Sequence, residues 1–140
     1  MFLKKIDNLF EIIFKNFYFS AHFILRFGLG VSFIIHGLSK FPLPPQNLMN
    51  YFNLSPFVSS FVAISELLAG SLIIFSGFLK TYIGSLLTRL AALIIVTIMI
   101  FAFYLAHKDW FINTKLFTSE QIFLFLLGFY FLIIGNKSLK

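Results

Sequence analysis

Four long apolar segments, joined by short polar stretches, constrain the fold of this chain more than any other feature of its sequence. They cover residues 19–40, 56–79, 83–106 and 119–135. Of the 140 residues, 59% are hydrophobic and only 11% are charged, whereas soluble domains average about 45–50% and about 25%. A chain of this length cannot hide so much apolar surface from water. The sequence therefore predicts an all-α integral membrane protein in which the four segments are transmembrane helices.

Prolines and capping residues mark the ends of these segments. Phe41-Pro42-Leu43-Pro44-Pro45 ends the first segment, because proline disfavours a helix at its own position and at the residue before it. Ser55-Pro56 opens the second as an N-cap followed by proline at the first helical position. Thr118-Ser119-Glu120-Gln121 has the capping-box pattern and introduces the fourth, which Gly135-Asn136 ends. This fourth segment reaches only about 25 Å. We expect it to span the membrane, with a re-entrant or interfacial placement as the alternative.

Residues 1–19 combine charged and apolar side chains in a pattern typical of an amphipathic helix. The apolar residues recur at steps of three and four, so a helix here has one apolar and one charged face, like helices that lie in the headgroup region of a bilayer. A cleavable signal peptide is the alternative, but charges interrupt the stretch where such a peptide needs a continuous apolar core, and no small-residue cleavage site follows. A second, short interfacial helix is expected over residues 46–53.

The lysines indicate how the chain crosses the membrane. With the N-terminus inside, six lysines lie on the cytoplasmic side and three outside, in agreement with the positive-inside rule. Arg26 and Arg89 lie within reach of the same inner surface. We therefore expect both termini, including the tail at 137–140, to be cytoplasmic. The inner lysines are Lys4, Lys5, Lys15, Lys80, Lys137 and Lys140; the outer ones are Lys40, Lys108 and Lys115.

Small residues recur at intervals of seven within each segment. Seven residues are nearly two helical turns, so each pair marks one side of its helix. In lipid, small residues promote helix association by letting backbones approach closely. We therefore predict a four-helix bundle over residues 20–136, although glycine is common enough in membrane helices to explain any single pair. The pairs are Gly30 and Gly37, Gly70 and Gly77, Gly84 and Ala91, and Gly128 and Gly135.

The ionisable residues within the segments are candidates for a functional site. Glu66 lies roughly 15 Å along its helix, where a lone carboxylate costs several kcal/mol unless it is protonated or paired. It is either a proton carrier or ligand contact, or part of an ion pair with Arg26 or Arg89 that stabilises the helices; the two roles are compatible. The small-residue faces also place Arg26 and Arg89 inside the bundle.

Three further residues, His36, Lys40 and His107, lie near the outer ends of the first and third helices, on the side that Glu66 faces. A polar pocket there would receive an anion or a quinone carbonyl. Plain interfacial residues are the alternative for Lys40 and His107. A metal site is disfavoured because no close pair at i, i+4 spacing supports it. The candidate pocket residues are Arg26, His36, Lys40, Glu66, Arg89 and His107; no catalytic residue and no metal ligand is expected.

Two classes of function are excluded by composition. Cysteine is absent, which excludes disulfides, thiolate metal sites and thiol redox mechanisms. The net charge of +6 comes from basic residues placed mostly between the apolar segments. Because they form no clustered basic footprint, nucleic acid is not an expected partner.

Several short motifs occur in a recognisable order. Residues 26–41 contain an arginine, paired glycines and an His-Gly-x-x-Lys ending; Glu66-Leu67-Leu68-Ala69-Gly70 and Thr88-Arg89-Leu90-Ala91-Ala92-Leu93 follow in the next two segments, and Gly135-Asn136 closes the fourth. Their order and spacing, from about residue 21 to 136, resemble those of the DoxX family of small bacterial membrane proteins. The resemblance favours Arg26, His36, Lys40, Glu66 and Arg89 as functional positions.

The resemblance implies a four-helix protein of the bacterial inner membrane. Some relatives are described as quinone-linked subunits of a thiosulfate-oxidising complex, and others as members of oxidative-stress assemblies with soluble partners. We therefore expect a membrane subunit or anchor of a redox or stress-response assembly, with quinone as candidate ligand, a soluble or membrane redox protein as partner, and homo-oligomers as an option. The alternatives are a small oligomeric transporter or proton pathway for an anion, and a purely structural scaffold. No catalytic activity is assigned to the isolated chain.

Overall fold

The structure, a computed structural model, describes residues 2–109 and 114–137, and every regular element within these ranges is a helix. The helices α2 (Tyr18–Leu38), α4 (Pro56–Phe75, extended by the 3-10 turn η2, Ser76–Phe78) and α5 (Tyr82–Ala106) are long and apolar enough to cross a membrane. Helix α7 (Glu120–Ile134) is also apolar but has only 15 residues. The chain thus has three membrane-capable helices, while a fourth span and the exact four-helix bundle stay predictions.

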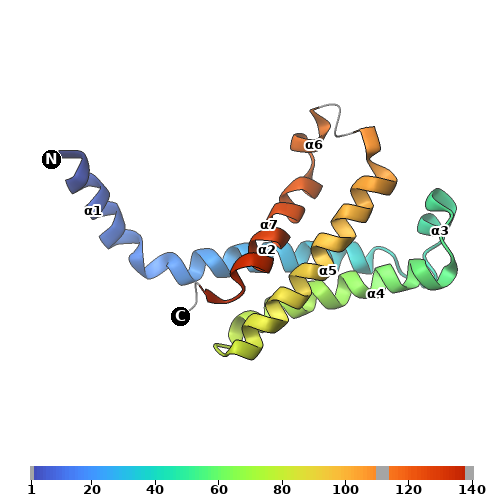
Figure 1. The fold of residues 1–140 in the computed structure, drawn as a ribbon, viewed down its shortest axis with the longest axis horizontal. Coiled ribbons are helices and arrows are strands. Elements are labelled where there is room, and N and C mark those ends of the chain that lie inside the picture. The colour runs from blue at the N-terminus through green and yellow to red at the C-terminus, as the bar shows by residue number, and fades with distance from the viewer. Residues whose placement is uncertain (1, 110–113, 138–140) are drawn as a thin grey trace.

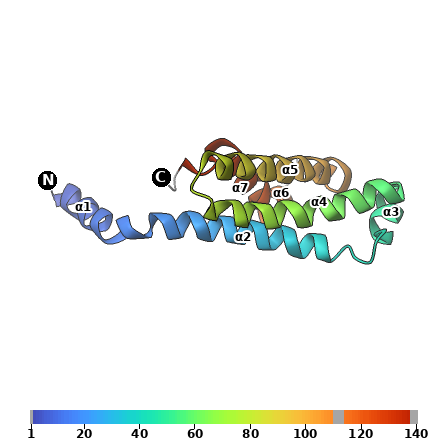
Figure 2. The same ribbon diagram turned by 90° about the horizontal axis from the view of Figure 1, so that it is seen from below.

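The long helices pack in chain order. Helix α4 lies between α2 and α5, α5 packs against α7, and α7 makes a smaller contact with α2. Figures 1 and 2 show that successive helices run in alternating directions, so that α2 begins and α7 ends at the same end of the molecule. The short helices α3 (Gln46–Phe52) and α6 (Lys115–Thr118) lie in the two connections at the opposite end.

Most helix ends lie where the sequence predicts them. Helix α2 ends at Leu38, before the proline-rich stretch. The hydroxyl of Ser55 accepts a hydrogen bond from the backbone N–H of Val58 at 3.3 Å, with Pro56 at the first helical position of α4. Gly135 follows α7 with φ = 61°, a backbone conformation that favours glycine. The short helix expected over 46–53 is also confirmed, as α3.

The capping-box prediction for α7 is wrong. Ser119 is the N-cap, but no side chain caps the helix there. The hydroxyl of Ser119 instead donates a hydrogen bond to the carbonyl of Leu116 at 2.9 Å. This carbonyl is available because the short helix α6 directly precedes α7, so the hydroxyl satisfies the end of one helix rather than the beginning of the next.

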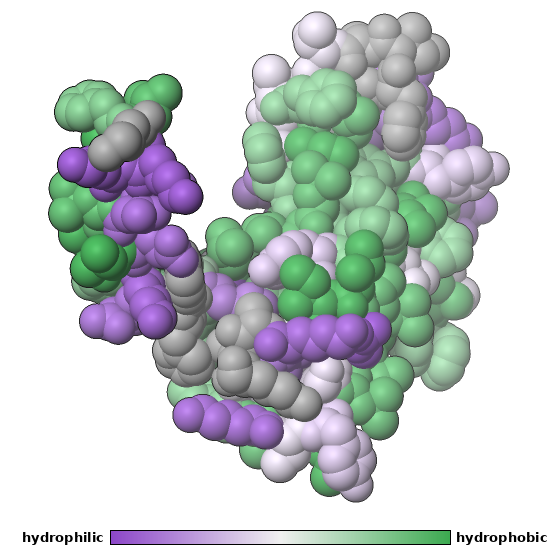
Figure 3. Space-filling model, turned by 60° about the vertical axis from the view of Figure 1, so that its left-hand side comes forward, coloured by the Kyte–Doolittle hydropathy of each residue, from purple (hydrophilic) through white to green (hydrophobic). Residues whose placement is uncertain are grey.

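The N-terminal segment forms helix α1 (Phe2–Phe14), followed by the 3-10 turn η1 (Lys15–Phe17). Every residue of α1 is exposed, and Figures 1 and 2 show α1 projecting away from the packed helices. In Figure 3, hydrophilic side chains gather along one side of α1 and hydrophobic side chains along the other. The predicted helix is therefore present, and its placement at the membrane interface stays a prediction.

Glycines bring α2 and α4 into backbone contact, as their spacing predicts. A Cβ atom on Gly70 would lie 2.6 Å from the carbonyl oxygen of Gly30 and 2.9 Å from the backbone nitrogen of Ile34. A Cβ atom on Gly37 would lie 2.9 Å from the backbone nitrogen of Leu67. Since real Cβ atoms do not approach backbone atoms so closely, only glycine allows this helix pair to pack at this distance.

Replacing Gly70 should separate α2 from α4. We expect Gly70→Ala to lower the free energy of unfolding by about 1–3 kcal/mol, because the added methyl group forces the two backbones apart. The measurement is denaturant unfolding in mild detergent, followed by circular dichroism. Gly28→Ala is the matched control, because a Cβ atom on Gly28 would meet nothing within 4 Å. Equal losses for the two variants would contradict the packing role.

Candidate functional site

Arg26 is fully buried near the end of the molecule where α2 begins. Its Nη1 donates to the carbonyl oxygen of Ile73 at 2.7 Å, to the hydroxyl of Thr88 at 2.8 Å and to that of Ser76 at 3.1 Å. Its Nη2 donates to Oδ1 of Asn136 at 2.7 Å. One side chain of α2 thus contacts α4, η2, α5 and the residues that follow α7. We call Arg26, His22, Ser76, Thr88 and Asn136 the arginine cluster.

No carboxylate of the described residues pairs with Arg26. Within residues 2–109 and 114–137, both ion pairs involve other cations. Ile73 lies in the last turn of α4 and Asn136 just beyond α7, and the C-terminal ends of helices carry partial negative charge. The guanidinium carbon also lies 4.8 Å from the centre of the Phe131 ring. Helix ends, hydroxyl groups and a ring face therefore stabilise the buried cation.

The cluster is linked internally as well. The Thr88 hydroxyl donates to Oδ1 of Asn136 at 2.7 Å, and Nδ2 of Asn136 donates to the carbonyl oxygens of Ser76 at 2.9 Å and Leu79 at 3.2 Å. The Ser76 and Thr88 hydroxyls lie 2.8 Å apart. His22 lies one turn before Arg26, with Nε2 3.4 Å from the arginine Nη2. A hydrogen-bonded network of this kind satisfies buried polar groups that would otherwise be costly.

Sequence reasoning identified Arg26 but missed the other members of this cluster. One signal was available: His22 shares the Gly30 and Gly37 face of its helix, which is buried. The prediction that Arg89 faces the interior of the bundle is wrong by one residue. Thr88 is fully buried, whereas Arg89 is half-buried. Neighbouring residues of a helix differ by about 100° in direction, so this one-residue difference moves the charge out of the core.

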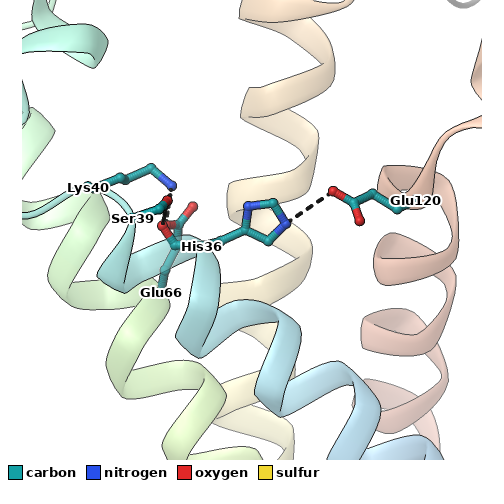
Figure 4. A network of polar contacts seen from close by, with 5 residues as sticks. All are labelled: His36, Ser39, Lys40, Glu66 and Glu120. Carbon is teal, nitrogen blue, oxygen red and sulfur yellow. Dashed lines mark hydrogen bonds and ion pairs between the residues drawn. The ribbon is translucent and has the colours of Figure 1, made fainter.

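At the opposite end, Lys40 and Glu66 form an ion pair (Figure 4). Glu66 is 5% exposed, and the Lys40 ammonium also donates to the carbonyl oxygen of His36 at 3.2 Å. The predicted pairing of Glu66 with Arg26 or Arg89 is therefore wrong. The reason is a difference in helix level: Gly37, near the end of α2, packs beside Ala63 and Leu67 in the middle of α4. A lysine just past α2 thus reaches a carboxylate that lies well inside α4.

His36 extends this group towards α7. Its Nε2 lies 3.3 Å from Oε1 of Glu120, and both side chains are substantially exposed. In Figure 4 the imidazole of His36 points to Glu120, while Lys40 and Glu66 lie on the other side of the α2 backbone. We call His36, Ser39, Lys40, Glu66 and Glu120 the lysine cluster.

The two remaining candidates, Arg89 and His107, lie outside the lysine cluster. Arg89 donates from Nη2 to the carbonyl oxygen of Ile133 at 2.7 Å and so caps the end of α7. His107 directly follows α5, and burial lowers its pKa below the ordinary value. The structure therefore brings together three of the six predicted residues, His36, Lys40 and Glu66, and places Arg26 in a second cluster.

A cavity of about 550 Å³ opens beside Lys40. Its size lies within the range of ligand sites, about 300–1,000 Å³. Lys40 supplies the charged group, Gln46 and Asn47 supply amides, and most of the remaining wall is apolar. An ammonium has three N–H donors, and Lys40 uses two of them on Glu66 and the His36 carbonyl, which leaves one for a ligand. The other lining residues are Ser39, Phe41, Pro42, Leu43, Pro44, Pro45, Leu48, Tyr51 and Phe52.

Comparison with known proteins identifies one family. The family model described as DoxX matches residues 21–108, which is more than half of the chain and includes most of α2, all of α4 and α5, and both Lys40 and Glu66. The resemblance seen in the sequence is thus confirmed. No curated protein and no solved structure matches the chain.

Removing Arg26 should destabilise the whole helix assembly. We expect Arg26→Gln to cost about 3 kcal/mol or more in the free energy of unfolding, because several buried acceptors lose a charged donor. Arg89→Gln is the control and should cost less than about 1 kcal/mol, since its hydrogen bond is exposed. Denaturant unfolding in detergent measures both. Comparable losses for the two arginines would show that the arginine cluster does not hold the fold together.

The Lys40–Glu66 pair should show coupling in a double-mutant cycle. Lys40→Met and Glu66→Gln should each lower stability by about 1–3 kcal/mol, because each leaves a poorly exposed polar partner behind. The double variant should lose less than the sum of the two. His36→Ala, which removes an exposed pair, should cost less than about 1 kcal/mol. Strict additivity of the Lys40 and Glu66 effects would contradict the pairing.

Proposed function

The chain belongs to the DoxX family, and from this premise we propose that it is a membrane subunit or anchor of a redox or oxidative-stress assembly whose cavity beside Lys40 binds a quinone or another lipophilic carbonyl compound. The observation that carries the proposal is the position of the half-buried Lys40, paired with the buried Glu66, at a cavity with mostly apolar walls. The association with redox or stress-response assemblies follows from the family resemblance.

The charge state of the cavity favours a neutral ligand. Glu66 already balances the charge of Lys40, so an anion gains little net attraction and meets a nearby carboxylate. A neutral carbonyl oxygen can accept the remaining N–H of Lys40 without disturbing the pair. The apolar body of such a ligand fits walls formed by Phe41, Leu48 and Phe52. These features support a lipophilic carbonyl compound over the anion that the sequence left open.

The space between the two polar clusters supports binding rather than transport. Arg26 and Lys40 are fourteen residues apart in sequence, which corresponds to roughly 20 Å along a helix. The buried residues between the clusters are apolar on both α2 and α4, so the described residues of these two helices offer no chain of buried polar groups for protons or anions. These residues are Leu29, Gly30 and Phe33 on α2, and Ala69, Gly70 and Ile73 on α4.

We place the protein in the bacterial inner membrane with both termini in the cytoplasm and the cavity on the outer side. The distribution of lysines supports this orientation, and α2 begins at the end of the molecule where α7 ends. The exposed helix α1 then lies along the inner surface with its apolar side in the bilayer. Helix α7 crosses as the fourth span if the bilayer adapts to its short length.

We assign electron transfer to a partner. The polar groups that line the cavity are an ammonium, two amides and the hydroxyls of a serine and a tyrosine, which can hold and orient a carbonyl. In this proposal the chain binds and positions the lipophilic ligand, and a soluble or membrane redox protein acts on it.

Lipid extraction of the purified protein tests the proposal. The full chain is purified from its membrane in mild detergent, and bound lipids and co-purifying proteins are identified by mass spectrometry. We expect quinone in the wild-type protein and about tenfold less in Lys40→Met, because a charged hydrogen bond of about 1.5 kcal/mol is lost. Leu48→Trp, which fills the cavity from the short helix α3, should have the same effect.

The matched control is Lys108→Met. Lys108 lies over the ring of Tyr104, at 4.8 Å from its centre, and does not line the cavity. This variant should retain quinone at the wild-type level. Recovery of neither quinone nor a stable partner from the folded wild-type protein would exclude both forms of the proposal.

A further inference from the structure

Three basic residues from three parts of the chain lie at the end of the molecule where α7 stops. Nδ2 of Asn136 donates to the carbonyl oxygen of Leu79 at 3.2 Å, which brings together the segments that carry Lys137 and Lys80. Both are exposed. Arg89 lies at the same end of the molecule, because its side chain donates a hydrogen bond to the carbonyl oxygen of Ile133 near the end of α7. We call Lys80, Arg89 and Lys137 the basic surface.

Arg89 is anchored to α7 through one hydrogen bond. Its Nη2 donates to the carbonyl oxygen of Ile133, and the backbone N–H of Asn136 donates to the hydroxyl of Ser85, one turn before Arg89, at 3.3 Å. A guanidinium has five N–H donors. In the described part of the chain this is the one hydrogen bond of the Arg89 side chain, so four donors remain for a ligand. The fork-like geometry of a guanidinium suits phosphate oxygens.

The five acidic side chains of the sequence lie outside the segments that form the basic surface. Asp7 and Glu11 lie on α1, which projects away from the packed helices (Figure 1). Glu66 and Glu120 belong to the lysine cluster at the opposite end, and Asp109 follows α5 at that same end.

Exposed aromatic residues flank the basic surface. Phe78 is 63% exposed and Tyr82 is 79% exposed, two residues to either side of Lys80. Tyrosine and tryptophan are enriched at the headgroup level of a bilayer, where one part of the ring contacts lipid and another contacts water. This places the basic surface at the depth of lipid phosphate groups.

We propose that Lys80, Arg89 and Lys137 bind the phosphate groups of anionic phospholipids. A membrane leaflet with anionic lipids attracts each nearby basic residue by an amount that corresponds to about fivefold in affinity. Arg89 forms the centre of the proposed binding surface, because its guanidinium is bonded to the end of α7 and has further N–H groups for a lipid phosphate. A bound lipid thereby fixes the end of the short helix α7. This inference is independent of the proposed ligand cavity, which lies at the other end of the molecule.

Native mass spectrometry of the full chain tests the inference. The detergent-purified protein is mixed with equal amounts of phosphatidylglycerol and phosphatidylcholine, and retained lipids are counted. The wild-type protein should retain phosphatidylglycerol preferentially. Lys137→Gln, an exposed position outside the helices, should reduce this preference about fivefold, and Arg89→Gln at least as much. Lys108→Gln, a cation at the opposite end, should leave it unchanged.

Three results would overturn the assignment. They are the absence of a preference for phosphatidylglycerol in the wild-type protein, an equal loss of preference in Lys108→Gln, and full retention of the preference when Arg89 and Lys137 are replaced together. Inorganic phosphate serves as the competing probe. If it displaces the lipid at millimolar concentration, the surface recognises free phosphate and is not a lipid-binding surface.

Discussion

The fold depends on how a fully buried guanidinium is stabilised inside an apolar protein. A charge removed from water requires compensating groups, and Arg26 finds them on every helix that surrounds it. The last turn of α4 contributes a backbone carbonyl oxygen with the partial negative charge of a helix end, and Asn136, two residues after α7, contributes a side-chain amide oxygen. Gly77 leaves room for the arginine, since a Cβ atom there would lie 2.6 Å from its Cδ. The interaction therefore fixes both the level and the rotation of the helices.

At the opposite end of the molecule, the charge of Lys40 is balanced by a carboxylate, Glu66. Lys40 comes from the connection after α2 and reaches Glu66 because α2 ends level with the middle of α4. The two ends therefore differ in chemical character. Both Nη groups of Arg26 donate within the protein, whereas Lys40 of the lysine cluster borders a cavity and retains a donor for a ligand. This difference explains why the proposed ligand site lies at Lys40, although Arg26 is the more deeply buried cation.

Local features of the chain were predictable and contacts between helices were less so. The proline stretch after α2, the Ser55 cap and the glycine after α7 end or begin helices through interactions with residues close in sequence. The capping box before α7 was misread because the preceding turn offers its own acceptor to Ser119. The inward position of Thr88 instead of Arg89 depends on the rotation of α5, which a regular spacing of small residues defines only to within about one residue.

The sequence by itself determined that this chain belongs in a membrane, where its helices begin and end, and which few polar residues lie within them. These properties follow from the length of the apolar segments, the placement of charged residues and capping by residues close in sequence, none of which depends on contacts between distant parts of the chain. Only the tertiary structure decided which polar residues are partners. The pairing of Glu66 with Lys40, the assembly of His22, Ser76, Thr88 and Asn136 around Arg26, and the hydrogen bond between Asn136 and Leu79 depend on the relative levels of helices. Those levels are set by the hydrogen bonds of Arg26 together with close packing at glycines distant in sequence, such as Gly30 and Gly70.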